Sequence, residues 1–158
     1  MNKKWLLSAV AGIVVAGIVV ALGIGTAFVS SYNSSEVKGN GELEELHPLQ
    51  MKKFMKEDGT GFVMYSFRES TRPVYMNEVK KALKENDVDA KELDTNDPQF
   101  ANDKSQSDYG VTQKTDTLAA YKDGKLKQEI EFESYDPSQL EVEISHFIKT
   151  SKELYFEE

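Results

Sequence analysis

Apart from its 27 carboxylates, this chain of 158 residues has few side chains that commonly act as a nucleophile, a base or a metal ligand. The chain has no cysteine, which excludes disulfides and thiolate metal sites. Its two histidines, His47 and His146, fall in the first and the last predicted helix, with no spacing that would pair them. Thr71, at the start of another predicted helix, could attack an electrophile only with a base nearby. We therefore interpret Thr71 as a helix N-cap and His146 as a half-buried packing residue.

Two groups of acidic and amide side chains could in principle bind calcium. They are Asp94, Asn96 and Asp97, and Glu129, Glu131 and Glu133. The first group follows a predicted strand, where Asn and Asp are frequent turn residues. The second group alternates with apolar residues, as one solvated face of a strand does. We favour these structural interpretations, and we predict no metal and no cofactor.

The periodicity of apolar residues predicts the elements that would position these side chains. Helices are predicted at residues 46–56, 75–85 and 98–109 and after Asp136, with strands at residues 62–67, 88–94, 117–121 and 125–133. The last two strands flank an Asp-Gly turn that requires positive φ, which indicates a hairpin. This order predicts an α/β fold in which helices cover both faces of a mixed sheet, in three α/β/α layers.

Each helix is expected to bury one apolar face. The expected buried residues are Leu46, Leu49, Met51 and Phe54 in the first helix, Met76, Val79 and Leu83 in the second, and Leu140, Ile144, Phe147 and Ile148 in the last. Asp136 is expected to cap the last helix, with Pro137 at its first position.

The N-terminal region predicts a membrane anchor. From Trp5 to Ser30 the chain is almost wholly apolar or small, a run of 26 residues. About 20 suffice to cross a membrane as a helix, whereas a cleaved signal peptide, the alternative, has an apolar stretch of only ~7–15. Because Lys3 and Lys4 precede this transmembrane helix, residues 1–4 are expected in the cytoplasm and the remainder outside the cell membrane. Residues 31–45 are expected to be a flexible stalk, and residues 46–158 one domain.

Small residues recur four apart within the predicted span, at Ser8, Gly12 and Ala16 and at Gly17, Ala21 and Gly25. Such spacing lets two helices approach closely, which would allow a homodimer, although Gly and Ala are also simply common in spans.

All 27 acidic residues follow the span, with 17 of the 19 basic residues, so the exported part has a net charge of −10. So acidic a surface argues against nucleic acid and anionic lipids as partners.

Four short motifs between residues 46 and 152 resemble the thioredoxin superfamily, in the family's order. They are Arg68-Glu69-Ser70, Asp94-Thr95-Asn96-Asp97-Pro98, Tyr109-Gly110-Val111, and Thr117-Leu118 with Tyr121-Lys122-Asp123-Gly124-Lys125. The first also resembles the Arg-Glu-Thr of Gram-positive bacteriocin-transport accessory proteins, which belong to that superfamily. The resemblance implies a bacterial protein with a thioredoxin-like fold.

The resemblance fails where the family performs thiol chemistry. Thr71-Arg72-Pro73-Val74 stands where a thioredoxin has Cys-Gly-Pro-Cys, and only the proline is kept. Asp116 replaces the family's cis-proline, so the preceding peptide bond is expected to be trans. Tyr65 falls at the family's buried aspartate, and Phe132 near the glycine that leaves room for a partner chain. These departures together imply a redox-inactive member without catalytic residues.

We therefore expect a non-catalytic protein outside the membrane that binds a protein or peptide, beside secretion, folding or conjugation machinery. Thr71, Arg72, Pro73 and Val74, with Asp116 opposite, are the expected contact surface. Arg72 is expected to project from the exposed helix start as a rare positive point. The alternatives are a structural subunit of a membrane complex with an inert groove and, more remotely, a thiol-disulfide oxidoreductase homologue with residual activity.

Overall fold

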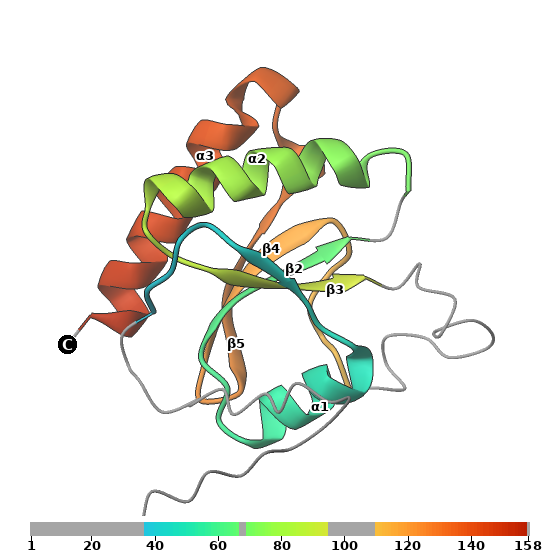
Figure 1. The fold of residues 1–158 in the computed structure, drawn as a ribbon, viewed down its shortest axis with the longest axis vertical. Helices are drawn as coiled ribbons and strands as arrows, with labels where there is room; N and C mark the ends of the chain where they lie inside the picture. Colours follow the sequence, from blue (N-terminus) through green and yellow to red (C-terminus); the bar gives the residue numbers. More distant parts are fainter. Residues whose placement is uncertain (1–36, 67–68, 95–109, 158) are drawn as a thin grey trace, which may run out of the picture.

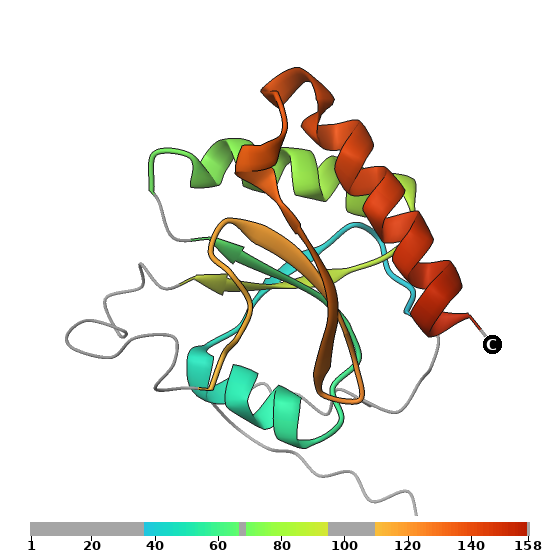
Figure 2. The ribbon, with the colours of Figure 1, turned by 180° about the vertical axis from the view of Figure 1, so that it is seen from behind.

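A computed structural model describes residues 37–66, 69–94 and 110–157. They form one mixed sheet of five strands in the order β1-β3-β2-β4-β5. Helices lie on both faces of this sheet (Figure 1, Figure 2). The predicted α/β class and mixed sheet are confirmed. The predicted helix at residues 98–109 lies outside the described residues.

The elements follow the chain as β1 (Leu43–Glu45), α1 (Pro48–Lys56), β2 (Gly61–Ser66), α2 (Arg72–Glu85), β3 (Ala90–Asp94), β4 (Thr117–Lys122), β5 (Lys125–Glu131), the 3₁₀ turn η3 (Phe132–Ser134) and α3 (Pro137–Ser151). A π-helical turn (Lys152–Phe156) continues α3. β3 runs parallel to both β1 and β2, whereas β4 is antiparallel to β2 and β5.

β2 is buried along its whole length, as predicted for the central strand. Its side chains alternate between two apolar clusters, one on each face of the sheet. Val63 and Tyr65 pack with Phe54 of α1 on one face. Phe62 and Met64 pack with α2 and α3 on the other. The predicted apolar face of α3 is buried as expected.

The hairpin of β4 and β5 is confirmed, with both turn residues in the left-handed region. Asp123 has φ 53° and Gly124 has φ 70°. Gly124 is required for a second reason, because a Cβ atom there would lie 1.9 Å from the carbonyl oxygen of Met55 in α1. The turn therefore packs closely against the end of α1.

Two helix starts differ from the prediction. α1 begins at Pro48 rather than residue 46, because His47 caps it: Nδ1 of His47 accepts from the Leu49 N–H, and Oε1 of Gln50 accepts from the His47 N–H. Leu49 then lies on the outer side and is 63% exposed, so its predicted burial is wrong. α2 begins at Arg72, directly after the predicted N-cap residue Thr71, and so includes three residues before the helical run predicted at residues 75–85.

The domain begins earlier than predicted. Residues 37–45, expected as part of a flexible stalk, dock on the loop between α2 and β3. The N–H groups of Gly39 and Gly41 donate to the carbonyl oxygens of Asp87 and Val88, at 2.9 and 3.2 Å. Oδ1 of Asp89 accepts from the N–H groups of Asn40 and Glu42, both at 2.8 Å. The chain then enters β1 beside β3, so these glycines serve close packing and not flexibility.

No helix in the described ranges is long and apolar enough to cross a membrane. The predicted span at residues 5–30 lies outside those ranges.

Candidate functional site

The first turn of α2 carries four of the five predicted contact residues. It lies at the end of the sheet where β2 and β3 finish and β4 begins. Thr71 is the N-cap residue, as predicted, but its side chain makes no capping hydrogen bond and its φ is −100°. Pro73 and Val74 face solvent, and Val74 is 49% exposed. Tyr75 turns inward and packs on the core, so the first turn presents a small apolar surface to the outside.

The prediction for Arg72 is wrong. Its side chain does not project as a separate positive point, because its Nε donates to Oε1 of Glu92 at 2.7 Å. Glu92 lies on β3, facing α2, with its side chain only 6% exposed. The hydroxyl of Ser66, at the end of β2, donates to the same Oε1 at 3.2 Å. Arg72 is therefore the counter-ion of a buried carboxylate.

Ser66, Glu92 and Arg72 could suggest an activated serine, since a carboxylate beside a hydroxyl can accept its proton. Ser66 is completely buried, however, and its Oγ is directed at Glu92. A substrate in solvent cannot reach it in this arrangement. The three side chains are better explained as one polar network that joins β2, β3 and α2 beneath the exposed first turn.

Asp116, the fifth predicted residue, lies at the same end of the sheet, just before β4. The Thr115–Asp116 bond is trans, as predicted, and Asp116 has φ 56°. Its carbonyl oxygen accepts from the Phe132 N–H at 3.0 Å. The Phe132 ring in turn lies 4.8 Å from the Tyr75 ring, measured between centroids. Asp116 is thus linked to the first turn of α2 through two aromatic residues.

These aromatic residues fill the interior of the site. Phe132, near the position where the resembled family has glycine, is 1% exposed. Tyr65, where that family has a buried acid, lies in the core cluster on the α1 side. Glu92, on the neighbouring strand, is a buried acid of this protein instead, and Asp116 is another. A single Glu inside the strand predicted at residues 88–94 was the signal that sequence reasoning missed.

Comparison with known proteins adds no assignment. No protein-family model and no curated protein matches this chain. The function therefore has to be inferred from the geometry of the site.

The structure also shows where most of the candidate calcium ligands and His146 lie. Glu131 is exposed, as predicted for a solvated strand face, but Glu129 is half-buried. Glu133 is exposed in η3, because β5 ends at Glu131 rather than at residue 133. Across residues 37–66, 69–94 and 110–157, no group of three or more acidic or histidine side chains is arranged to hold a metal ion. Asn96 and Asp97 lie outside these ranges. His146 is exposed rather than half-buried, because the buried face of α3 passes through Phe147 and Ile148.

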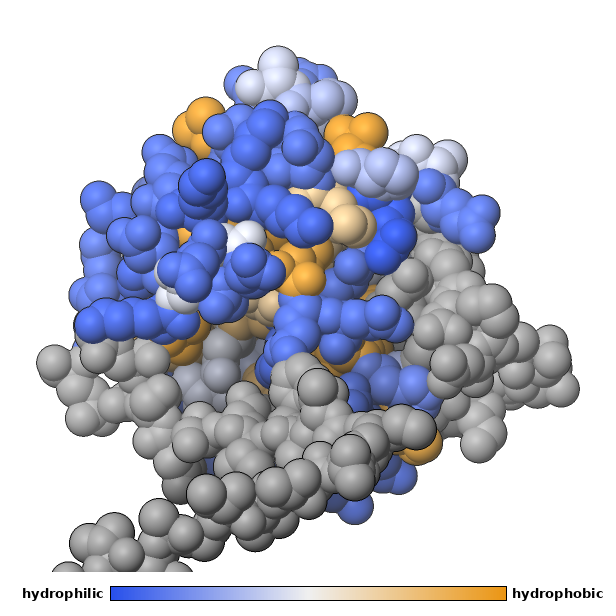
Figure 3. Space-filling model, in the orientation of Figure 1, coloured by the Kyte–Doolittle hydropathy of each residue, from blue (hydrophilic) through white to orange (hydrophobic). Residues whose placement is uncertain are grey.

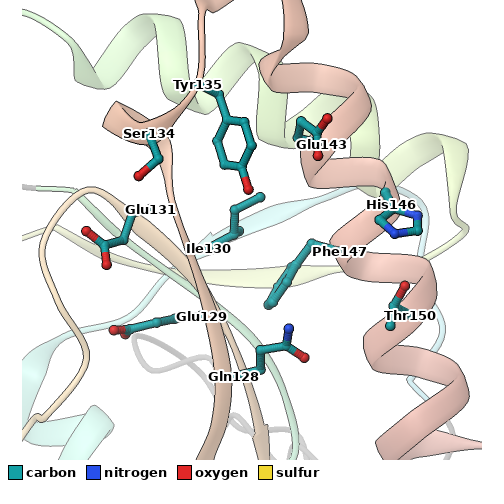
Figure 4. A pocket seen from close by; sticks show the side chains of 10 residues that line it. All are labelled: Gln128, Glu129, Ile130, Glu131, Ser134, Tyr135, Glu143, His146, Phe147 and Thr150. Atoms are coloured by element: carbon teal, nitrogen blue, oxygen red, sulfur yellow. The ribbon is translucent and has the colours of Figure 1, made fainter.

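A second surface, absent from the sequence predictions, is an open hollow of about 340 Å³ between β5 and α3. Residues 128–131, Ser134 and Tyr135 line one side, and Glu143, His146, Phe147 and Thr150 line the other. Ile130 and Phe147 lie between strand and helix, whereas Glu129 and Glu131 point away from α3 (Figure 4). Its lining contains three glutamates and no lysine or arginine.

Proposed function

We propose that the protein is a redox-inactive, thioredoxin-like domain that binds a protein or peptide through the first turn of α2. We further propose that residues 5–30 anchor it in the cell membrane, with the domain outside. The observation that carries the binding proposal is the exposure of Val74, together with Pro73, at the place where the resembled family contacts its substrates.

The topology supports the thioredoxin-like assignment. Two parallel strands, β2 and β3, are joined by α2, and an antiparallel hairpin and α3 follow. α2 and α3 share one face of the sheet, with α1 on the other. These features, with the four sequence motifs, favour this superfold over other mixed α/β arrangements. A fold alone does not imply a function, so the function has to be argued from the residues of the site.

The chemistry of the site supports a non-catalytic function. The two positions that hold sulfur in the resembled family carry Thr71 and Val74. The nearby carboxylate of Glu92 is held by Arg72 and Ser66 beneath the surface. Phe132 and Tyr75 pack against each other beside Asp116. Among the residues that the structure describes, this arrangement offers an apolar contact surface and no exposed nucleophile–base pair.

The surroundings of the first turn favour a contact surface of limited size. Hydrophilic side chains cover most of the described surface in one view, with apolar residues showing as small spots (Figure 3). Exposed apolar side chains on such a surface are candidate anchors when they are held rigidly. Val74 is held on α2 between Pro73 and the inward-facing Tyr75. A structural subunit remains the competing function, since scattered exposed apolar residues are also normal.

Site-specific photocrosslinking in intact cells separates these two functions. A photoreactive residue is placed at Val74 of the full-length protein, and a matched control at Leu49, which is 63% exposed on α1. We expect a discrete crosslinked protein from position 74 and none from position 49. The same crosslinks from both positions, or none from position 74, would support the structural subunit instead.

The absence of thiol chemistry has its own test. Purified full-length protein is expected to leave insulin turbidity with dithiothreitol at the level of the buffer. Reduction of insulin clearly above that level would contradict the proposal and revive the oxidoreductase alternative.

A further inference from the structure

β5 is the last strand of the sheet, so within the described part of the chain one side of its backbone has no neighbouring strand. Such an edge can pair its N–H and C=O groups with an added extended segment. The hollow between β5 and α3 runs beside this edge over residues 128–131. Edge and hollow therefore form one continuous surface, separate from the first turn of α2.

We propose that this surface binds an extended cationic segment of another protein, with one apolar residue between two lysines or arginines. The inference follows from the two faces of β5. Ile130 points into the hollow toward Phe147, and Glu129 and Glu131 point to the opposite face (Figure 4). Side chains of an added strand alternate in the same way.

This alternation fixes the preferred sequence of the segment. The side chain beside Ile130 enters the hollow, where Phe147 and Tyr135 provide apolar and aromatic surface. The residues before and after it lie beside Glu129 and Glu131, since directly opposed cross-strand pairs are in contact. A basic–apolar–basic triplet satisfies all three positions in either strand direction.

The charges support a cationic occupant. Among the described residues, Lys114 forms an ion pair at this edge: its Nζ pairs with Glu131, and its uncharged backbone N–H donates to Glu129 at 3.1 Å. The ammonium group of Lys114 therefore pairs with one of these two carboxylates, and Glu143 adds a third carboxylate across the hollow. The net charge of −10 after the span also attracts a basic segment.

A second copy of this chain fits the edge less well. β5 itself contains Lys125-Leu126-Lys127, which would match the charge pattern. A register shift opposite Ala120 and Tyr121 interrupts the alternation, however, and Leu126 packs on the α1 face. Antiparallel pairing of two copies keeps each face on its own side, so Leu126 would lie on the face opposite the hollow. The occupant we infer is a different protein.

Fluorescence anisotropy with full-length protein in non-ionic detergent tests the proposal. The probe is a labelled nonapeptide, Thr-Val-Thr-Lys-Val-Lys-Thr-Val-Thr. We expect it to bind, with an affinity that falls as salt is raised. The peptide with Glu-Val-Glu at its centre, and the lysine peptide N-methylated at alternate amides, are expected not to bind. The double variant Glu129→Gln with Glu131→Gln should raise Kd at least about threefold, while Glu57→Gln on α1 leaves it unchanged.

Three results would overturn the proposal. Equal binding of the N-methylated peptide would exclude strand addition. An unchanged Kd in the double variant would exclude the charge pairing. Self-association of the wild-type protein that the double variant abolishes would assign the edge to a second copy. If the peptide still binds the Val74→Asp variant, its binding surface is distinct from the first turn of α2. The proposal for the β5 edge and the proposal for α2 can therefore fail independently.

Discussion

Among single residues, Glu92 is a buried carboxylate that two neighbouring side chains hold in place. It is buried on β3 and its Oε1 accepts from Arg72 and Ser66. Removing the cation would leave a buried charge without its counter-ion, which costs more than losing an exposed pair. Arg72→Met should therefore lower the free energy of unfolding by about 2–4 kcal/mol.

Urea denaturation measures this effect, with Lys53→Met as the matched control. Lys53 pairs with Glu57 at 3.7 Å on the surface, and its loss should cost less than about 0.5 kcal/mol. Adding Glu92→Gln to Arg72→Met should recover part of the stability, because the amide removes the buried charge. An Arg72→Met variant as stable as the control would show that Glu92 does not depend on Arg72.

The backbone conformation of Asp116 is one that proline cannot adopt. Its φ of 56° lies in the left-handed region, whereas proline is fixed near −65°. Asp116→Pro should destabilise the protein by more than about 1 kcal/mol, whereas glycine adopts this φ without strain. Denaturation of both variants should find Asp116→Gly clearly the more stable. Equal stability would mean that the loop readily accepts the proline conformation.

Tyr121 makes stability dependent on alkaline pH. Burial raises its pKa above the ordinary 10.0, with a smaller contribution from the charge of Glu129, and its hydroxyl donates to Gln113 at 3.2 Å. Because the folded state keeps the proton more tightly than the unfolded state, stability is complete below about pH 10 and falls as pH rises further. Unfolding free energies at pH 8–11 should show this fall, and Tyr121→Phe should flatten it. Tyr135→Phe, at an exposed tyrosine, should leave the slope unchanged.

Residue positions were predictable from sequence, but their partners were not. The chain order places Thr71 to Val74 at a helix start, and the structure agrees. The pairing of Arg72 with Glu92 depends on how α2 lies across β3, 20 residues further along the chain. Helix periodicity carries no information about that contact. The exposure of His146 depends on how α3 is rotated about its axis. The neighbouring Phe147 alone did not allow that rotation to be predicted.

At the scale of elements, β1 depends on the docking of residues 37–42. Gly41 has φ 86°, and a Cβ atom there would lie 2.6 Å from Cβ of Lys84. Gly41→Ala should therefore cost both conformational strain and a clash with α2. Gly110→Ala is the matched control, because Gly110 has φ 74° and none of the described residues places an atom within 4 Å of a Cβ atom there. Urea denaturation should show that Gly110→Ala lowers the free energy of unfolding by about 1 kcal/mol, because of the strained φ alone. Gly41→Ala should lower it further, because the clash is added.

Amide hydrogen exchange would check the structural consequence of the same substitution. Gly41→Ala should increase exchange in residues 43–45 while β2 stays protected. Similar losses for both alanine variants would indicate that residues 37–42 contribute little to the fold.

The elements found from sequence are those with strong local signals. The hairpin carried an Asp-Gly turn, and β2 an unbroken apolar run. β1 has only three residues, two of them acidic. Its position beside β3 follows from hydrogen bonds that residues 39–42 donate to the carbonyl oxygens of Asp87 and Val88 and to the side-chain carboxylate of Asp89. No periodicity exists in so short a segment. The hollow beside β5 was missed for a related reason, since it arises from the approach of α3 to an edge strand.

At the scale of the whole molecule, the proposed topology makes a direct prediction. If residues 5–30 are an uncleaved anchor, a tag after Glu158 should be digested by protease added to intact protoplasts, because the domain lies outside. Immunoblotting of the tag follows this loss, and a cytoplasmic protein serves as the control for intact membranes. The purified protein should retain Trp5. A protein free in the medium that begins near Phe28 would contradict the anchor.

The docking of residues 37–45 also limits how far the domain can travel. Only the six residues 31–36 then separate the proposed span from the domain, a reach of at most about 21 Å when fully extended. A stalk of residues 31–45 would have allowed about 50 Å. Since accessible volume scales with the cube of reach, the shorter connection confines the domain to a volume roughly tenfold smaller and raises its effective concentration toward partners in the same membrane.

The attachment point also sets the direction in which the domain faces. The chain enters beside Asp87, just beyond the end of α2, while Thr71 lies at the other end of that helix. A helix of 14 residues is about 21 Å long. With the entry point nearest the bilayer, Val74 faces away from it. A partner would then meet Val74 from the side opposite the proposed anchor.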